Sequence, residues 1–285
     1  MSGATPQSRY RLRASEGIEP GRPVAWLLIV LLVSLTLVAA LAPWLTPYDP
    51  VQPTGPVHLA PLSPGHLLGT DQIGRDLFSR TLLGIRASWF SSLAVVLGGL
   101  VIGGLVGLVA GATGGWVDTV LMRITDLFLA LPGALVAIAI VAALGPGLRN
   151  TLLGVSLVWW PYYARILRGE VRALAARPHL EAARLSGVGR ARLLRRHLLP
   201  GVVPTAVVTA SLDVGNVVLL LAGLSFLGLG QPAPAPELGA DTARALSELL
   251  THWWVPGIPG LAVLLLSLVA NLGGDAIRVL TPRRW

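Results

Sequence analysis

The chain has 285 residues, of which 53% are hydrophobic and 13% are charged. Soluble domains carry roughly 25% charged residues, so this composition excludes an ordinary soluble protein and indicates several membrane spans. The net charge is +8 and all 22 basic residues are arginines, but they lie in short loops between apolar runs, which is typical of membrane orientation rather than of nucleic-acid binding. Cysteine is absent, which excludes disulfides and thiol chemistry.

Taken in chain order, six apolar runs approach the length of about 20 residues that a membrane-spanning helix needs. The first has no cleavage site after it, so we interpret it as an uncleaved anchor. The third is interrupted by Arg123, Asp126 and Pro132. The fold class predicted from these runs is an all-α membrane protein with six transmembrane helices, at 24–41, 89–112, 117–144, 148–167, 202–224 and 258–272.

The arginines predict the orientation of these spans. With the N-terminus and the C-terminus both inside the cell, most arginines are cytoplasmic, as the positive-inside rule requires. Only five then lie outside: Arg75, Arg80, Arg86, Arg149 and Arg244. We therefore divide the chain into a cytoplasmic tail at 1–23, a first helix with an extracytoplasmic segment at 24–85, and a five-helix core at 86–285 that contains a cytoplasmic loop at 170–200.

Small residues and paired charges inside the spans predict helix packing. Gly99, Gly103, Gly107 and Gly111 recur every four residues, a face that lets two helices approach closely. Arg123 and Asp126 are three residues apart on one predicted helix and can pair with each other. Both features favour a structural role over a direct role in a pore.

The segment 181–200 is too polar for lipid and lies between two apolar runs. Pro178 suits the first turn of a helix, whereas Gly187 and Gly189 interrupt it. A second helical piece is expected at 190–199, with a ridge formed by Leu193, Leu194 and Leu198, and Pro200 is expected to end it. Such a helix–turn–helix could lie on anionic lipid, bind nucleic acid, or dock into a soluble protein. No soluble domain accompanies it to support the nucleic-acid alternative.

The segment Glu181-Ala182-Ala183, followed by Gly187 and by Leu199-Pro200, resembles the loop of permease subunits of ABC importers. Other stretches resemble the C-type branch that serves dipeptide, oligopeptide and nickel importers. They occur in the family order over roughly residues 24–285 and are Gly69-Thr70-Asp71-Gln72-Ile73-Gly74-Arg75-Asp76, Leu121-Met122-Arg123-Ile124-Thr125-Asp126, Leu224-Ser225-Phe226-Leu227-Gly228-Leu229-Gly230 and Asn271-Leu272-Gly273-Gly274-Asp275.

This resemblance implies a type I importer permease with a coupling helix that docks into a cytoplasmic ATPase. It implies a second homologous permease, two ATPases that bind ATP and Mg²⁺, an extracytoplasmic substrate-binding protein facing 48–80 and 226–256, and a bacterial or archaeal cytoplasmic membrane. It also assigns coupling to the positions that match the loop: Glu181, Ala182, Ala183, Gly187, Leu193, Leu194, His197, Leu199 and Pro200.

The substrate remains open between a peptide and nickel. The spans contain no His or Cys and few Met, which favours peptides. Asp213, with Ser211 and Asn216 near it, is the candidate for a position on the translocation path, where its carboxylate would meet a peptide ammonium group. The alternative is that Asp213 makes a hydrogen bond between helices.

We do not expect this chain to hydrolyse ATP or to catalyse another reaction by itself. A P-loop needs a lysine, and the sequence has none. The five histidines lie in loops or in the segment 181–200 without the spacing of a metal site, so we expect surface residues, no catalytic residue and no metal. A secondary transporter would need inverted repeats and broken helices, and a membrane-embedded enzyme would need paired acids or a nucleophile with its base. Neither pattern is visible.

Overall fold

A computed structural model describes residues 21–281, without the side chains at 179, 181, 184, 190 and 191. This part of the chain is helical, with two isolated β-bridges and no strand. The long helices are α1 (Arg22–Leu45), α2 (Leu77–Thr113), α5 (Leu148–Ala175), α8 (Leu199–Phe226) and α10 (Trp254–Leu280). The shorter ones are α3 (Gly115–Leu129), α4 (Gly133–Leu144), α6 (Pro178–Leu185), α7 (Arg190–Leu193), the π-helix η1 (Leu194–Leu198), α9 (Leu238–Arg244) and the 3₁₀ helix η2 (Leu246–Glu248).

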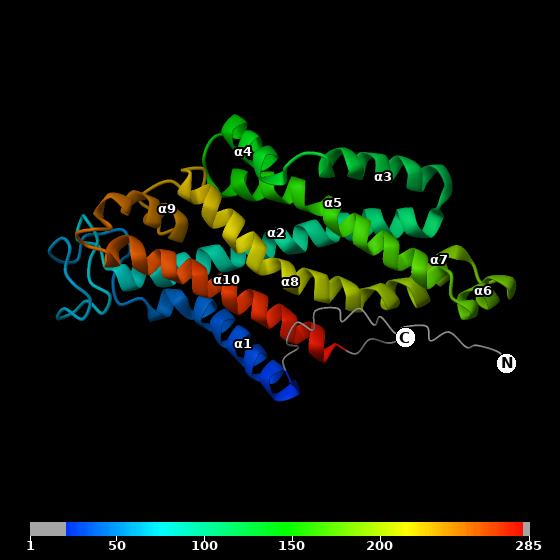
Figure 1. The fold of residues 1–285 in the computed structure, drawn as a ribbon, viewed down its shortest axis with the longest axis horizontal. Helices are drawn as coiled ribbons and strands as arrows, with labels where there is room; N and C mark the ends of the chain where they lie inside the picture. Colours follow the sequence, from blue (N-terminus) through cyan, green and yellow to red (C-terminus); the bar gives the residue numbers. More distant parts are fainter. Residues whose placement is uncertain (1–20, 282–285) are drawn as a thin grey trace, which may run out of the picture.

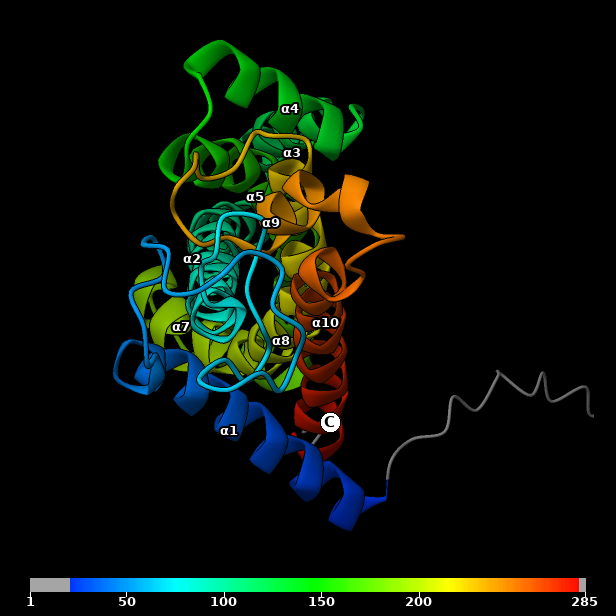
Figure 2. The same ribbon diagram turned by 90° about the vertical axis from the view of Figure 1, so that its left-hand side faces the viewer.

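The helices form an elongated bundle around α2, α5, α8 and α10 (Figure 1). Seen along the bundle, α1 lies on one side of this group against α10 and α2, and the α3–α4 pair lies on the opposite side against α5 (Figure 2). The main apolar core is built where α2, α5, α8 and α10 meet, around Trp89, Tyr163, Val217 and Leu266.

Among the described residues, four helical stretches are long and apolar enough to cross a membrane: α1, α2, the continuous run from Leu194 to Phe226, and α10. The α3–α4 pair counts as a fifth if it forms one bent span. The helix α5 is long enough to cross a membrane but is less apolar than the others, so it is not counted among them. The chain is therefore a multi-pass membrane protein.

The third predicted span, 117–144, is not one straight helix. It divides after Leu129 into α3 and α4, whose axes differ by 81°. Pro132 lies in the break, where it supplies no N–H and disfavours a helical conformation in the residue before it. The sequence therefore marked the interruption of this run at Pro132, but not the angle between its two parts.

The predicted glycine face of α2 is confirmed. A Cβ at Gly103 would lie 2.1 Å from the carbonyl oxygen of Trp160, and one at Gly107 would lie 2.5 Å from that of Ala164. A Cβ at Gly111 would lie 2.8 Å from the Cβ of Val171. Since real Cβ atoms do not approach other atoms this closely, α2 and α5 can touch backbone to backbone only because these residues lack a side chain.

The bundle has two distinct ends. The segment 46–76 and α9 lie at one of them, which we call the α9 end, and α6 and α7 lie at the other, which we call the α6 end (Figure 1). The start of α1 and the end of α10 point toward the α6 end (Figure 1). The basic segment 181–200 is thus separated from the segment 46–76 by the length of the bundle.

At the α9 end, the motif from Gly69 to Asp76 folds the segment 46–76 back onto α2. Asp71 accepts hydrogen bonds from Arg75 through the backbone N–H at 2.9 Å and through Nε at 2.6 Å. Asp76 caps α2 by accepting from the N–H of Ser79 at 2.8 Å. Gly69 has φ +79°, and a Cβ there would lie 2.1 Å from the carbonyl oxygen of Leu59. The residue types of this motif are therefore explained by the contacts that fold the segment 46–76.

Arg80 joins this folded segment to α9. Its side chain is 2% exposed, and its guanidinium donates to the carbonyl oxygen of Pro50 at 2.7 Å and to Asp241 Oδ1 at 2.6 Å. Pro50 precedes α2 in the sequence and Asp241 lies in α9, so the buried Arg80 joins the segment 46–76, α2 and α9.

Candidate functional site

The segment 178–200 forms the predicted helix–turn–helix. The helix α6 ends at Leu185, and Gly187 takes φ +82° in the turn before α7. Ser186 and Val188 donate their N–H groups to the carbonyl oxygens of Ala182 and Ala183, at 2.9 and 3.1 Å. This is the way in which glycine closes the C-terminus of a helix.

Three leucines of this segment face the chain's own core. Leu180, Leu193 and Leu198 are 1%, 5% and 2% exposed and pack against α5 and α8. The predicted ridge therefore anchors the segment to the bundle, and Leu193 is not available to a partner. Leu194 is partly buried beside it.

Other predicted coupling positions face solvent. Ala182, Gly187, His197, Leu199 and Pro200 are exposed, and Ala183 is half-buried. The backbone of Glu181 lies in α6, but its side chain is outside the described part of the structure. Leu185, to which the sequence assigned no role in coupling, is 85% exposed beside the turn. Its place two residues before Gly187 is the signal that could have added it to the docking positions.

Pro200 does not end the second helical piece. The chain changes at Leu194 to a π-helix, and the N–H of Leu199 donates to the carbonyl oxygen of Leu194. Pro200 is the second residue of α8 and directly follows the π-helix, so its missing N–H removes one hydrogen bond of the helix without ending it. The segment is consequently joined to α8 by continuous helix.

Asp213 lies in the middle of α8 and faces α5. It accepts hydrogen bonds from Trp159 Nε1, from the hydroxyl of Tyr163 at 2.9 Å and from Asn216 Nδ2 at 3.4 Å. Its side chain is largely buried, and a buried carboxylate is tolerated when donors surround it. The hydrogen bond between helices that the sequence suggested is therefore present.

Asp213 also borders a cavity of about 410 Å³ beside the break between α3 and α4. Asn216 lies in the same wall, whereas Ser211 borders a separate apolar cavity and donates to the carbonyl oxygen of Val208 at 2.8 Å. The lining is mainly apolar and aromatic: Phe128, Leu129, Leu131, Gly133, Val158, Trp159, Tyr162, Asp213 and Asn216. Sequence reasoning did not connect Trp159 and Tyr163 with Asp213.

Ion pairs hold α3 to α5 between this cavity and the α6 end. Asp118 binds Arg168 at 2.8 Å and Arg172 at 2.5 Å through their guanidinium groups. Asp126 pairs with Arg165 at 2.5 Å, so the predicted pair with Arg123 is wrong. Because α3 packs on α5, Asp126 pairs with Arg165 of α5 and not with Arg123 of its own helix.

The histidines are not all surface residues. His66 is 6% exposed, and its Nδ1 lies 2.9 Å from Asp76 Oδ1, so it supports the start of α2. His197 is exposed, as expected. His179 has no described side chain. His58 and His252 lie together at the α9 end.

Comparison with known proteins places these features in a family. Residues 103–285 match the family described as "Binding-protein-dependent transport system inner membrane component". The chain is 37% identical over 285 residues to the "Probable D,D-dipeptide transport system permease protein DdpC" of Escherichia coli (strain K12), with 99% of this chain and 96% of that protein covered.

Two further relatives are similar over most of their length. The "Di/tripeptide transport system permease protein DppC" of Pseudomonas aeruginosa (strain UCBPP-PA14) is 41% identical over 256 residues, which cover 88% of this chain and 84% of that protein. The "Nickel transport system permease protein NikC" of Escherichia coli (strain K12) is 38% identical over 252 residues, which cover 88% and 91%.

A solved structure supports the fold. A chain of the MetNI methionine ABC transporter in inward-facing conformations superimposes with a TM-score of 0.56 at 20% identity, over 71% of this chain and 97% of that chain. The family match and the relatives define a permease of the ABC importer class. The chain belongs to the family of binding-protein-dependent transport system inner membrane components.

Proposed function

We propose that this chain is one permease subunit of an ATP-driven importer of small peptides. The observation that carries the substrate class is the buried carboxylate of Asp213, which borders a cavity large enough for part of a small solute. A carboxylate in a mainly apolar, aromatic wall suits a peptide ammonium group. The names of two relatives, which refer to dipeptides and to di- and tripeptides, point the same way.

Nickel is the alternative substrate, because one relative is named for it. The cavity beside Asp213 favours peptides, since its described lining has one carboxylate and no His, Cys or Met. Nickel prefers imidazole and other nitrogen ligands to a lone carboxylate.

The assembly we propose has a second homologous permease, two cytoplasmic ATPases that bind ATP and Mg²⁺, and an extracytoplasmic binding protein. The membrane is a bacterial or archaeal cytoplasmic membrane. The α6 end is cytoplasmic, because its exposed arginines follow the positive-inside rule. The chain crosses six times, with α3 and α4 together forming one bent span. We keep the division into 1–23, 24–85 and 86–285, whose second boundary falls inside α2.

In this mechanism the turn at Gly187 docks into an ATPase. Ala182, Leu185 and His197 are exposed around it, while Leu180, Leu193 and Leu198 fix its position on α5 and α8. Closure of the ATPases then moves this segment, and α8 carries the movement to the cavity. ATP hydrolysis belongs to the partner subunits, and this chain supplies the path and the docking segment.

Dipeptide uptake by cells that express the assembled importer tests the substrate. Asp213→Asn removes the charge and keeps the shape, so we expect uptake to fall about tenfold or more, the effect of losing a charge-assisted hydrogen bond. Asp126→Asn is the matched control, because Asp126 is an exposed carboxylate outside the cavity. Unchanged uptake in Asp213→Asn would overturn the role of Asp213.

ATPase stimulation by the binding protein tests the docking segment. Gly187→Trp places a large side chain at the turn, and we expect stimulation to be lost while basal hydrolysis by the ATPases persists. Glu181→Arg tests the residue that the family resemblance emphasises. Normal stimulation in both variants would contradict docking at this segment.

A further inference from the structure

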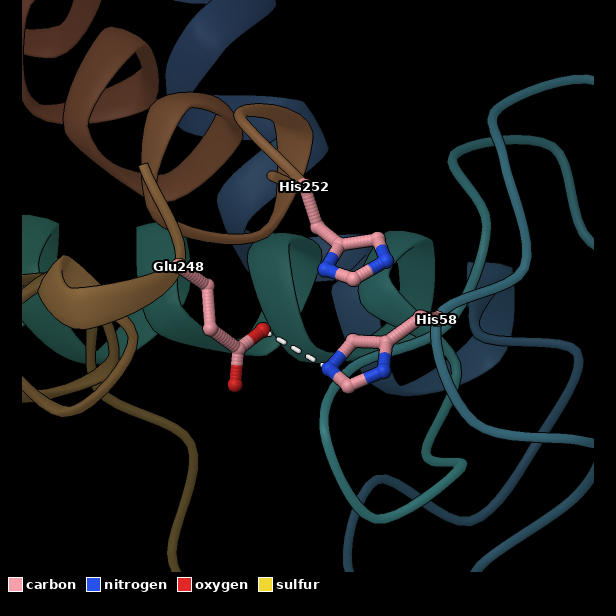
Figure 3. A group of neighbouring side chains, drawn as sticks. All are labelled: His58, Glu248 and His252. Atoms are coloured by element: carbon pink, nitrogen blue, oxygen red, sulfur yellow. Dashed lines mark ion pairs between the residues drawn. The ribbon is translucent and has the colours of Figure 1, made fainter. Parts of the chain in front are cut away.

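His58, Glu248 and His252 converge at the α9 end of the molecule (Figure 3). Each side chain offers one ligand atom, and these atoms all lie within 4.8 Å of one another. The three residues come from the segment 46–76, from η2 and from the turn before α10. Their meeting is therefore a product of the fold, which explains why no metal-ligand spacing appears in the sequence.

The three donor atoms are shielded from solvent and make no hydrogen bond. His58 Nε2 lies 2.8 Å from Glu248 Oε2, at ion-pair distance, but the contact lacks hydrogen-bond geometry. These two atoms and His252 Nδ1 are buried and have no hydrogen-bond partner among the described residues. Three buried polar atoms that face one another without hydrogen bonds call for an explanation, because each one costs free energy.

The surroundings hold the three side chains in this arrangement. The imidazole rings of His58 and His252 stack in parallel, with centroids 4.1 Å apart and planes 9° apart. One nitrogen of each ring is turned toward the side where the Glu248 carboxylate lies (Figure 3). Trp254 packs edge-on against His252. These contacts hold the three side chains close together, but parallel rings cannot both aim their in-plane lone pairs at one ion, so one imidazole has to turn when a metal binds.

Backbone hydrogen bonds also hold these three residues in position. The N–H of His252 donates to the carbonyl oxygen of Glu248 at 2.7 Å, which fixes the turn that presents both side chains. His58 has φ +57°, a left-handed conformation that is uncommon for a residue with a side chain. Its N–H donates to the carbonyl oxygen of Asp71 at 3.1 Å, which ties it to the folded motif at the start of α2.

We infer that His58, Glu248 and His252 form a binding site for a divalent transition metal of the zinc type. Two imidazoles and one carboxylate form a ligand set that zinc accepts, with one position left for water. Magnesium and calcium are disfavoured, because they prefer oxygen ligands. Ligand distances of about 2.1 Å require the three donor atoms to move closer to a common point and one stacked ring to turn toward the ion.

A bound metal would join the segment 46–76 to the start of α10. These parts already meet in an apolar cluster that contains Leu68, Val255 and Ile258, so the metal would add a polar link at the same end. The inference does not depend on the proposed function, since the site lies in the loops of the α9 end and is separate from the cavity of Asp213.

Zinc binding to the full-length chain, purified with its co-expressed partner subunits, tests the site. The protein carries no polyhistidine tag and is first treated with EDTA. Isothermal titration with Zn²⁺ should show a site that Mg²⁺ does not fill. His58→Ala, His252→Ala and Glu248→Gln should each weaken Zn²⁺ binding by at least about tenfold, and Zn²⁺ should raise the unfolding temperature of the wild type but not of these variants.

His197→Ala is the matched control, because His197 is an exposed histidine at the α6 end. It should bind Zn²⁺ as the wild type does. Glu248→Gln keeps the size of the side chain, so it remains informative if a histidine variant does not fold. No Zn²⁺ binding by the wild type, or equal binding in all three ligand variants, would overturn the assignment.

Discussion

Buried charges at the α9 end find their partners inside the chain, whereas the described charges of the segment 178–200 face solvent. Arg80 and Asp71 are 2% and 4% exposed and are bonded to neighbouring segments. Arg192, Arg195 and Arg196 are exposed at the α6 end. One end is thus completed by its own fold, and the other keeps its charges free for a partner or for lipid headgroups. The difference shows which end the chain stabilises by itself.

The largest effect should come from breaking the network at the α9 end. Arg80→Met leaves Asp241 and the carbonyl oxygen of Pro50 without their buried donor, which costs about 3–5 kcal/mol. The unfolding temperature, followed by tryptophan fluorescence in nanodiscs, should fall strongly. Arg244→Met is the control, because Arg244 pairs with the same Asp241 but is 31% exposed, and such a pair contributes about 1 kcal/mol or less. Equal losses in the two variants would contradict the comparison.

Two glycines with the same backbone conformation should respond differently. Gly69 and Gly187 have φ +79° and +82°, so alanine is strained at both, by about 1–2 kcal/mol. At Gly69 the new methyl group would also meet the carbonyl oxygen of Leu59, whereas at Gly187 nothing lies within 4 Å. Gly69→Ala should therefore cost about 3 kcal/mol in all.

Gly187→Ala should strain only the local turn, and the unfolding temperature of the whole bundle should stay nearly unchanged. A large drop in this variant would mean that the turn contributes to the fold as Gly69 does. The same thermal measurement serves both substitutions.

Within the segment 178–200, one leucine should matter for stability and another should not. Leu180→Ala removes a side chain that is 1% exposed, and we expect a loss of about 2 kcal/mol, seen as faster proteolysis of this segment. Leu185→Ala removes one that is 85% exposed. Proteolysis should not change in that variant, while ATPase stimulation in the assembled importer should fall. The reverse pattern would show that the segment is not anchored by Leu180.

The smallest effect concerns pH. Glu237 caps α9 by accepting from the N–H of Ala240 at 2.9 Å, and burial raises the pKa of its carboxyl above that of a free glutamate, against the hydrogen bonds that lower it. The folded state therefore holds this proton more tightly than the unfolded state. The stabilisation that the protonated Glu237 provides therefore declines as the pH rises from the pKa of this group in the unfolded chain toward its pKa in the folded chain.

Glu237→Gln removes this titration. The unfolding temperature of the wild type relative to the variant should decrease between pH 4.5 and neutral pH. A difference that stays constant over this range would contradict the raised pKa. The measurement needs only the thermal assay used for the other variants, repeated in a series of buffers.

Much of the fold could be predicted from the sequence, because it depends on local or periodic signals. The apolar runs, the glycine face of α2 and the turn at Gly187 each need only neighbouring residues and standard helix geometry. The family could be recognised for the same reason, since its motifs are short and occur in a fixed order.

What could not be predicted depends on partners far apart in the chain. Trp159 meets Asp213 across 54 positions, and Arg80 meets Asp241 across 161. The pairing of Asp126 with Arg165 follows from the packing of α3 on α5, which no spacing within α3 reveals. The angle between α3 and α4 is likewise set by the surfaces that they cover, although Pro132 marks its place.

The continuous helix from Leu194 to Phe226 has a mechanical consequence. Asp213 follows Leu199 by fourteen residues in α8, a distance of about 21 Å at 1.5 Å per residue. Pro204 removes one hydrogen bond within this length, but α8 stays helical through it, so a small tilt at its base becomes a larger sideways travel at the carboxylate. A rotation of about 10° would move Asp213 by about 4 Å, roughly the width of an ammonium group.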